Sequence, residues 1–227
     1  QESVPAQCEV YVPRPPSEAS CTANGASVAL AWTAPDLYDS VAIVKDGVLL
    51  TVLPGGVGAY LDTNVAAGVH TYALRATLGT SVSETVTCQT TVVPAPVNAT
   101  CAANADSADV AWELGAAYDA VVVFVDGEGV ATLPGAAQTY TVSGLAPGTH
   151  VIEIAGVIAG VQSARTACTV TVLAAPGAFA CAAQGAAIIL TWQNAGTYAE
   201  LGVVRDGIEL ARLPGGTGTY TDANAPA

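Results

Sequence analysis

Methionine is absent from this 227-residue chain, and phenylalanine and histidine occur only twice each. Basic residues are also scarce, because 6 lysines and arginines stand against 19 aspartates and glutamates, for a net charge of -13. That sign repels phosphate backbones and anionic lipid surfaces, so nucleic acid is excluded as a partner. No apolar run approaches the roughly 18 residues needed to cross a bilayer, so no membrane insertion is expected.

Hydrophobic residues make up 52% of the chain and charged residues 11%, which is not the composition of a disordered protein. The 23 glycines and 13 prolines lie among stretches rich in valine, threonine and alanine. This composition favours strands and turns over helices.

A period of 80 residues, without insertion or deletion, runs through the chain. The same tryptophans, cysteines, tyrosines, Asp-Gly pairs and Leu-Pro-Gly triplets recur at that interval. They begin at Trp32, Trp112 and Trp192; Cys21, Cys101 and Cys181; Tyr38, Tyr118 and Tyr198; Asp46, Asp126 and Asp206; Leu53, Leu133 and Leu213.

Each repeat has the pattern of short strands. Stretches such as "SVALAW" alternate apolar and polar residues, as a half-buried strand does. In "VAIVKDGVLLTVLPG" two apolar runs flank Asp-Gly, which indicates a hairpin. About seven such strands per repeat predict an all-β chain of tandem antiparallel β-sandwiches.

These segments resemble a known family. The tryptophan of the second strand, "GVHTYALRA" in the first repeat and "YxxxxVxxDGxxxxxLPGxxxxYTD" in the third resemble bacterial fibronectin type III modules, which belong to the immunoglobulin-like sandwiches. The resemblance covers essentially the whole chain. It implies that Trp32, Trp112 and Trp192 are core residues. It also places Tyr72 at the corner tyrosine of the family, where the second repeat has Ile152.

The repeat frame is offset from the ends of the sequence. Residues 21–100 and 101–180 form complete repeats, whereas residues 181–227 stop before the last two strands. Residues 1–20 align with 81–100 and therefore contain a last strand, here called the N-terminal arm, followed by a linker. Three whole repeats would need only 13 more residues. The proline-rich linkers favour extended connections of about 3 Å per residue, so a rod is expected.

Six cysteines without C-x-x-C spacing indicate disulfides in an oxidising, extracellular compartment. Pairing across a linker (Cys8 to Cys21, and so on) would require two Cα atoms within about 4.4–6.8 Å across a proline-rich extended segment, which disfavours this alternative. Pairing within repeats joins Cys21 to Cys88 and Cys101 to Cys168, and we favour it. Each bond closes a long loop and contributes about 4 kcal/mol in the entropy model.

This pairing leaves Cys8 and Cys181, which are in register to pair between two copies of the chain. In the N-terminal arm, Cys8, Val10 and Val12 fall on one strand face. A sandwich lacking strands invites an incoming strand, so the sequence predicts head-to-tail strand donation closed by a Cys8–Cys181 disulfide. The missing penultimate strand leaves three options: the arm shifts inward, a second segment fills the gap, or the chain continues past Ala227.

Other recurring residues are assigned structural roles. Histidine could ligate a metal and Asp-Gly could ligate calcium, but we prefer a strand-start role for histidine and a hairpin-turn role for Asp-Gly. Tryptophan could stack on a sugar and tyrosine could form a binding face, but we prefer core and packing roles for them. No cofactor, metal or catalytic site is predicted, because no nucleophile elbow or phosphate loop occurs and the glutamates are unrelated in position. The residues concerned are His70, His150, Tyr60, Tyr140, Tyr220, Glu18, Glu113 and Glu200.

The sequence thus predicts a non-enzymatic, extracellular structural protein that polymerises with itself. The alternative is a stalk or spacer of a larger secreted adhesin or cell-surface enzyme, with a surface receptor that the sequence does not identify. Asn98 lies in a glycosylation sequon within a linker and is therefore expected to be exposed.

Overall fold

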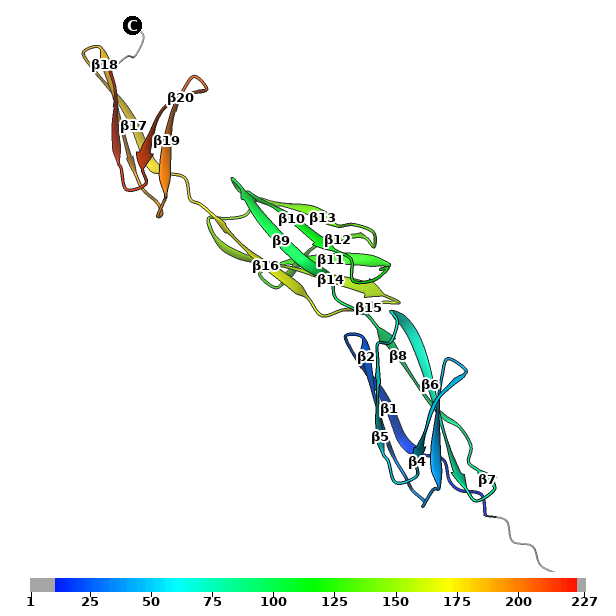
Figure 1. Ribbon diagram of the computed structural model, residues 1–227. Helices are drawn as coiled ribbons and strands as arrows, with labels where there is room; N and C mark the ends of the chain where they lie inside the picture. Colours follow the sequence, from blue (N-terminus) through cyan, green and yellow to red (C-terminus); the bar gives the residue numbers. More distant parts are fainter. Residues whose placement is uncertain (1–10, 224–227) are drawn as a thin grey trace, which may run out of the picture. The chain divides into compact units, whose positions relative to one another are not determined.

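A computed structural model describes residues 11–223. These residues form strands and turns, and no helix in that range could cross a membrane. Each repeat consists of two antiparallel sheets, as the ribbon in Figure 1 shows. The predicted all-β fold class is therefore confirmed.

The strands recur at the sequence period. The first repeat contains β1 Ser17–Asn24, β2 Ser27–Thr33, β3 Ser40–Lys45, β4 Val48–Pro54, β5 Ala59–Thr63, β6 Gly68–Leu78, β7 Ser81–Val82 and β8 Val86–Val92. The second contains β9 Val97–Asn104, β10 Ser107–Glu113, β11 Ala120–Val125, β12 Glu128–Pro134, β13 Thr139–Ser143, β14 Gly148–Ile158, β15 Val161–Gln162 and β16 Thr166–Val172. The third contains β17 Gly177–Gln184, β18 Ala187–Gln193, β19 Glu200–Arg205, β20 Ile208–Pro214 and β21 Thr219–Asp222.

The first strand of every repeat begins earlier than the sequence boundary. Strands β1, β9 and β17 begin four residues before Cys21, Cys101 and Cys181, so boundaries set at these cysteines fall inside a strand. The "SEAS" segment that opens β1 has no clear apolar alternation and gave no strand signal.

The first repeat shows how a complete sandwich is built. One sheet has the order β1-β2-β5, and the other has the order β4-β3-β6-β7, with β8 also paired to β6. The core comes from alternate residues of the central strands, as the "SVALAW" pattern predicts. Val28, Val41, Ile43 and Tyr72 are all 0% exposed.

The Leu-Pro-Gly triplet ends the fourth strand where it passes close to another backbone segment. A Cβ atom built on Gly55 would lie 1.8 Å from the carbonyl oxygen of Tyr38, and Gly135 and Gly215 have the same 1.8 Å approach to their tyrosines. The amide of Gly55 also donates to the carbonyl of Asp39 at 3.1 Å. Glycine recurs at this position because only hydrogen fits there.

Each linker is held by the sandwich that follows it. The hydroxyl of Tyr38 donates to the carbonyl of Arg14 at 2.9 Å. Tyr118 and Tyr198 donate in the same way to the carbonyls of Pro94 and Ala174, both at 2.7 Å. This role explains the 80-residue recurrence of these tyrosines.

The linker before the first sandwich has an additional ion pair. The Arg14 guanidinium donates to Asp36 Oδ1 at 2.6 Å, and the Tyr11 hydroxyl donates to Asp36 Oδ2 at 2.7 Å. Hydrogen bonds from the Arg14 side chain and backbone, followed by that from Tyr11, lower the pKa of Asp36 to about 2. The later repeats have Ala116 and Gly196 at this position, so this contact is specific to the linker that follows the N-terminal arm.

Gly55→Ala is expected to destabilise the first sandwich by about 2–3 kcal/mol, because its Cβ would overlap the Tyr38 carbonyl. Gly56→Ala is the matched control, since a Cβ there meets nothing within 4 Å. Hydrogen exchange of the β3 amides measures both effects. Equal protection in the two variants would contradict the steric explanation.

The Asp36 carboxylate is expected to titrate with a pKa of about 2, and Arg14→Gln should raise this pKa toward 3.8. Because the folded pKa lies below the unfolded one, the contact stabilises the linker above about pH 4 and is lost as pH falls toward 2. Carboxyl NMR during an acid titration measures the shift. Arg212→Gln, in the third repeat, is the control and should leave the pKa of Asp36 unchanged.

Candidate functional site

The third repeat presents an incomplete sandwich within residues 11–223. Its sheets are β17-β18-β21 and the hairpin β19-β20. In the first repeat β3 lies between β4 and β6, whereas β19, its counterpart, pairs with β20 alone among the described strands. The counterparts of β6, β7 and β8 are therefore not among the described residues.

The inner side chains of the third repeat are more exposed than their counterparts. Val28 and Leu30 are 0% and 2% exposed, whereas Ile188 and Leu190, at the matching positions, are only half-buried. All eight residues of β17 are exposed, and Phe179 on this strand is 63% exposed. The surface formed by Phe179, Ile188, Leu190, Trp192, Leu201 and Val203 is called the open face below.

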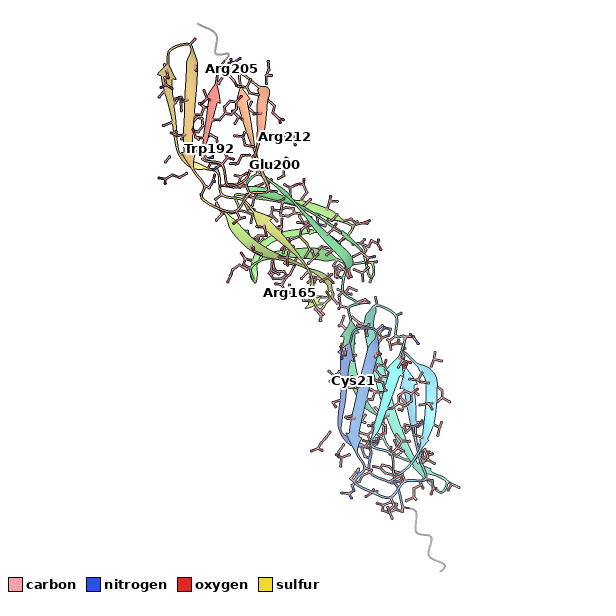
Figure 2. All side chains as sticks on the ribbon, turned by 60° about the vertical axis from the view of Figure 1, so that its left-hand side comes forward. Cys21, Arg165, Trp192, Glu200, Arg205 and Arg212 are labelled. Atoms are coloured by element: carbon pink, nitrogen blue, oxygen red, sulfur yellow. A yellow bond between two sulfur atoms is a disulfide. The ribbon has the colours of Figure 1, made fainter. Side chains whose placement is uncertain are left out.

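Two adjoining grooves lie on the open face. One, of about 270 Å³, is lined by residues that include Phe179, Trp192 and Leu201. The other, of about 320 Å³, includes Ile188, Arg205 and Asp222 in its lining. Trp192 and Arg205 lie toward opposite ends of the third repeat in Figure 2. The open face therefore extends along the strands, as a bound strand requires.

The tryptophans remain buried in all three repeats, including the incomplete one. Trp32, Trp112 and Trp192 are 6%, 3% and 9% exposed. They lie at the same position of β2, β10 and β18, where the alternating pattern placed them inward. This burial leaves no stacked tryptophan surface for a sugar.

The cysteine pairs in the two complete sandwiches follow the sequence spacing. Cys21 is bonded to Cys88 with Cα atoms 5.9 Å apart, and Cys101 to Cys168 with Cα atoms 5.8 Å apart. Each disulfide joins the first strand of its sandwich to the last. Cys181 occupies the first-strand position of the third repeat and is an exposed free thiol.

Of the three proposed donor residues, Val12 is among the residues that the structure describes. Cys8 and Val10 lie outside the described residues, so the structure says nothing of their placement. Val12 is described and is 60% exposed, whereas Val92 and Val172, its counterparts in the complete repeats, are 0% and 4% exposed. Val12 is therefore exposed at an aligned position that is buried in both complete repeats.

A polar cluster, not anticipated from the sequence, lies inside the first sandwich. The Asp62 carboxylate, 6% exposed, accepts from the Tyr72 hydroxyl at 2.7 Å and from Lys45 Nζ at 2.9 Å. Desolvation, with a further contribution from Asp62, raises the pKa of Tyr72 above its usual value. The corner tyrosine thus donates to a side chain.

The same cluster is charged in the third repeat and apolar in the second. Arg205 donates to Asp222, which is also 6% exposed. The second repeat has Val125, Val142 and Ile152 at the three positions. The three positions differ as a set between the repeats, but the sequence does not show that they lie together in the fold.

The histidines and Asp-Gly pairs have local structural roles. His70 Nδ1 lies 2.7 Å from Asp46 Oδ2, and His70 Nε2 lies 2.9 Å from the carbonyl oxygen of Ala66. Asp46, Asp126 and Asp206 have φ of 51°, 52° and 51°, which a hairpin turn requires. Within residues 11–223, no group of three or more His, Cys, Asp or Glu side chains could hold a metal ion.

Two further groups raised by the sequence are also located. Tyr60, Tyr140 and Tyr220 are half-buried on β5, β13 and β21, consistent with packing residues. Asn98 is exposed on β9, and its amide donates to Glu113 at 3.0 Å. The sequon asparagine is therefore at the surface, as expected, but it lies on a strand and not in a linker.

No family model and no curated protein matches this chain. A two-domain fibronectin type III segment of chicken tenascin has 19% identity and a TM-score of 0.51, covering 69% of this chain and 99% of its own. The central fibronectin III array of RIM-binding protein (20% identity, TM-score 0.32) covers 94% of this chain and 87% of its own. The FN1–FN3 domains of chicken CNTN1 (10% identity, TM-score 0.34) cover 95% and 90%. The tenascin match and the sheet order together identify the fold as a tandem array of fibronectin type III-like β-sandwiches.

Proposed function

We propose that this protein is an extracellular structural subunit that polymerises head to tail. Tandem fibronectin type III-like sandwiches and two disulfides fit an extracellular structural or stalk protein. In the assembly that we propose, the N-terminal arm of one copy adds a strand to the third repeat of another. Cys8 of the first copy then bonds to Cys181 of the second.

The observation that carries the proposal is the exposed Cys181 thiol beside the open face. At the equivalent positions Cys21 and Cys101 are bonded to the last strand of a complete sandwich. The arm segment "AQCEVYV" aligns with β8 "VTCQTTV" and β16 "TACTVTV", and its cysteine is in the same place. The arm therefore has the register that a disulfide to Cys181 requires.

Covering the open face supplies the driving force. Each apolar side chain buried there contributes about 1.5–3 kcal/mol relative to exposure. The interface joins two different surfaces of the same chain. Such a contact repeats without closing and produces a filament unless the geometry forms a ring.

A stalk or spacer within a larger adhesin or enzyme is the second candidate. It is favoured by the repeat architecture itself, because a tandem pair of domains with this fold matches 69% of the chain. In that case, strands of the same polypeptide would cover the open face, and Cys181 would pair within one chain.

The disulfide is expected to be asymmetric. Oxidised wild-type protein should give a ladder on non-reducing electrophoresis that collapses to monomer with thiol. Cys8→Ser and Cys181→Ser should each remain monomeric, and an equimolar mixture of the two should stop at dimer, since only one pair of thiols remains. Dimers formed by Cys8→Ser alone would show Cys181–Cys181 pairing and reject the head-to-tail arrangement.

Strand donation, as distinct from disulfide formation, is tested at Val12. Val12→Asp should weaken non-covalent association of reduced protein at least about tenfold, because its counterparts Val92 and Val172 are buried. Glu9→Gln is the control, since Gln89 and Thr169 at that position are exposed. Sedimentation velocity measures the association. Equal association of both variants would mean that the arm does not insert.

A further inference from the structure

The Asp36 carboxylate joins the N-terminal arm to the first sandwich. Its Oδ2 accepts from the Tyr11 hydroxyl at 2.7 Å and from the Arg14 backbone amide at 2.8 Å. Its Oδ1 accepts from Arg14 Nη2 at 2.6 Å and from Arg14 Nε at 3.0 Å. A carboxylate offers about four acceptor sites, so these four donors use all of them. The Asp36 side chain is accordingly 9% exposed, although the Arg14 side chain is 67% exposed. Tyr11, Arg14 and Asp36 are called the arm clamp below.

Both backbone polar groups of Arg14 are bonded to the first sandwich. Its amide donates to Asp36, and its carbonyl accepts from the Tyr38 hydroxyl at 2.9 Å. Pro13 and Pro15 flank Arg14, and their rings restrict the backbone on both sides of it. These bonds and prolines together fix the direction in which the chain leaves the sandwich toward the N-terminal arm.

The arm clamp is present in one linker and absent from the other two as a set. The residues at its three positions are Thr91, Pro94 and Ala116 in the second repeat, and Thr171, Ala174 and Gly196 in the third. The hydrogen bond from the linker tyrosine is kept there, because Tyr118 and Tyr198 donate to the carbonyls that correspond to that of Arg14. The clamp is therefore an addition to the common linker design, and it occurs where the chain carries the arm.

We infer that the arm clamp orders the end of the N-terminal arm before two copies meet, and so positions the arm for strand donation to a second copy. The inference deepens the proposed function and rests on it. Ordering a flexible segment costs conformational entropy, and a segment ordered in the free subunit does not add this cost to association. Asp36 is thus a positioning residue, which acts on the donated strand through Tyr11 and Arg14.

The clamp is compatible with an inserted arm. Successive side chains of a strand point to opposite faces, so Tyr11 points away from the acceptor when Val10 and Val12 face its core. Thr171, the counterpart of Tyr11 in the second repeat, is exposed in a complete sandwich. Tyr11 can therefore keep its hydrogen bond to Asp36 of its own subunit while its neighbours enter the other subunit.

Removal of the clamp tests its effect on the arm. Asp36→Ala installs the residue that the second repeat has at this position, so the variant should fold. In full-length Cys8→Ser protein, at a concentration where it is monomeric, ¹⁵N relaxation should give Tyr11 and Arg14 backbone order parameters of about 0.85. The same order parameters should fall below about 0.6 in Asp36→Ala. Asp106→Ala removes the same charge from an exposed turn of the second repeat and is the control.

Sedimentation velocity of the same proteins tests the effect on assembly. The Cys8→Ser background cannot form the intersubunit disulfide, so it reports non-covalent association alone. Asp36→Ala should weaken this association at least about threefold, and Asp106→Ala should leave it unchanged. Tyr11→Thr installs the residue of the other two repeats and keeps the Arg14–Asp36 pair, so its effect should be intermediate.

Each result decides the question. Unchanged order parameters in Asp36→Ala would overturn the inference, and so would unchanged association. Tighter association would show that the clamp holds the arm back, which is the opposite of the inferred role. Tryptophan fluorescence checks folding, and if Asp36→Ala does not fold, Tyr11→Thr decides alone. No association by the Cys8→Ser parent would reject strand donation and the inference with it, whereas equal association by parent and Asp36→Ala would reject the inference alone.

Discussion

The placement of β6 beside β3 is the constraint on which this structure depends. In a complete sandwich β6 lies between β3 and β8, so it buries the inner faces of both sheets and satisfies two strand edges. In the third repeat, where no counterpart of β6 is described, Ile188 and Leu190 are half-buried although Val28 and Leu30 are buried, and Cys181 is exposed. An exposed apolar face of that kind is typical of an interaction surface.

The sequence was sufficient for the fold because its signals are local and repeated. Alternation in "SVALAW" and the Asp-Gly hairpins depend on neighbouring residues, and three copies in register remove most ambiguity. It was insufficient for contacts between distant residues. The register of β3 with β6 pairs Lys45 with Tyr72, and only the packing of the two sheets brings Asp62 to both, so the polar cluster of the candidate site was not predicted.

Glycine and linker positions illustrate the same limit. The sequence marks Gly55 as part of a recurring triplet, but it does not show whether the glycine serves a turn or a close backbone contact. The structure shows the close contact, because a Cβ on Gly55 would lie 1.8 Å from the Tyr38 carbonyl oxygen. Arg14 and Asp36 are 22 residues apart and occur together in the first repeat only, so the period conceals their contact. Departures from the repeat therefore carried as much information as the repeat itself.

Near-identical repeats pose a pairing problem that the polar cluster helps to solve. Strands of similar sequence could complete the wrong sandwich, since their aliphatic residues are interchangeable at small cost. A buried carboxylate changes this, because a strand with isoleucine in place of Tyr72 removes a donor from Asp62, and a strand with tyrosine in place of Ile152 places an unmatched hydroxyl against Val142. Such penalties act on wrong partners more than they stabilise the right one. The difference between the polar set of the first repeat and the apolar set of the second thus gives each of these two sandwiches a chemical preference for its own strand.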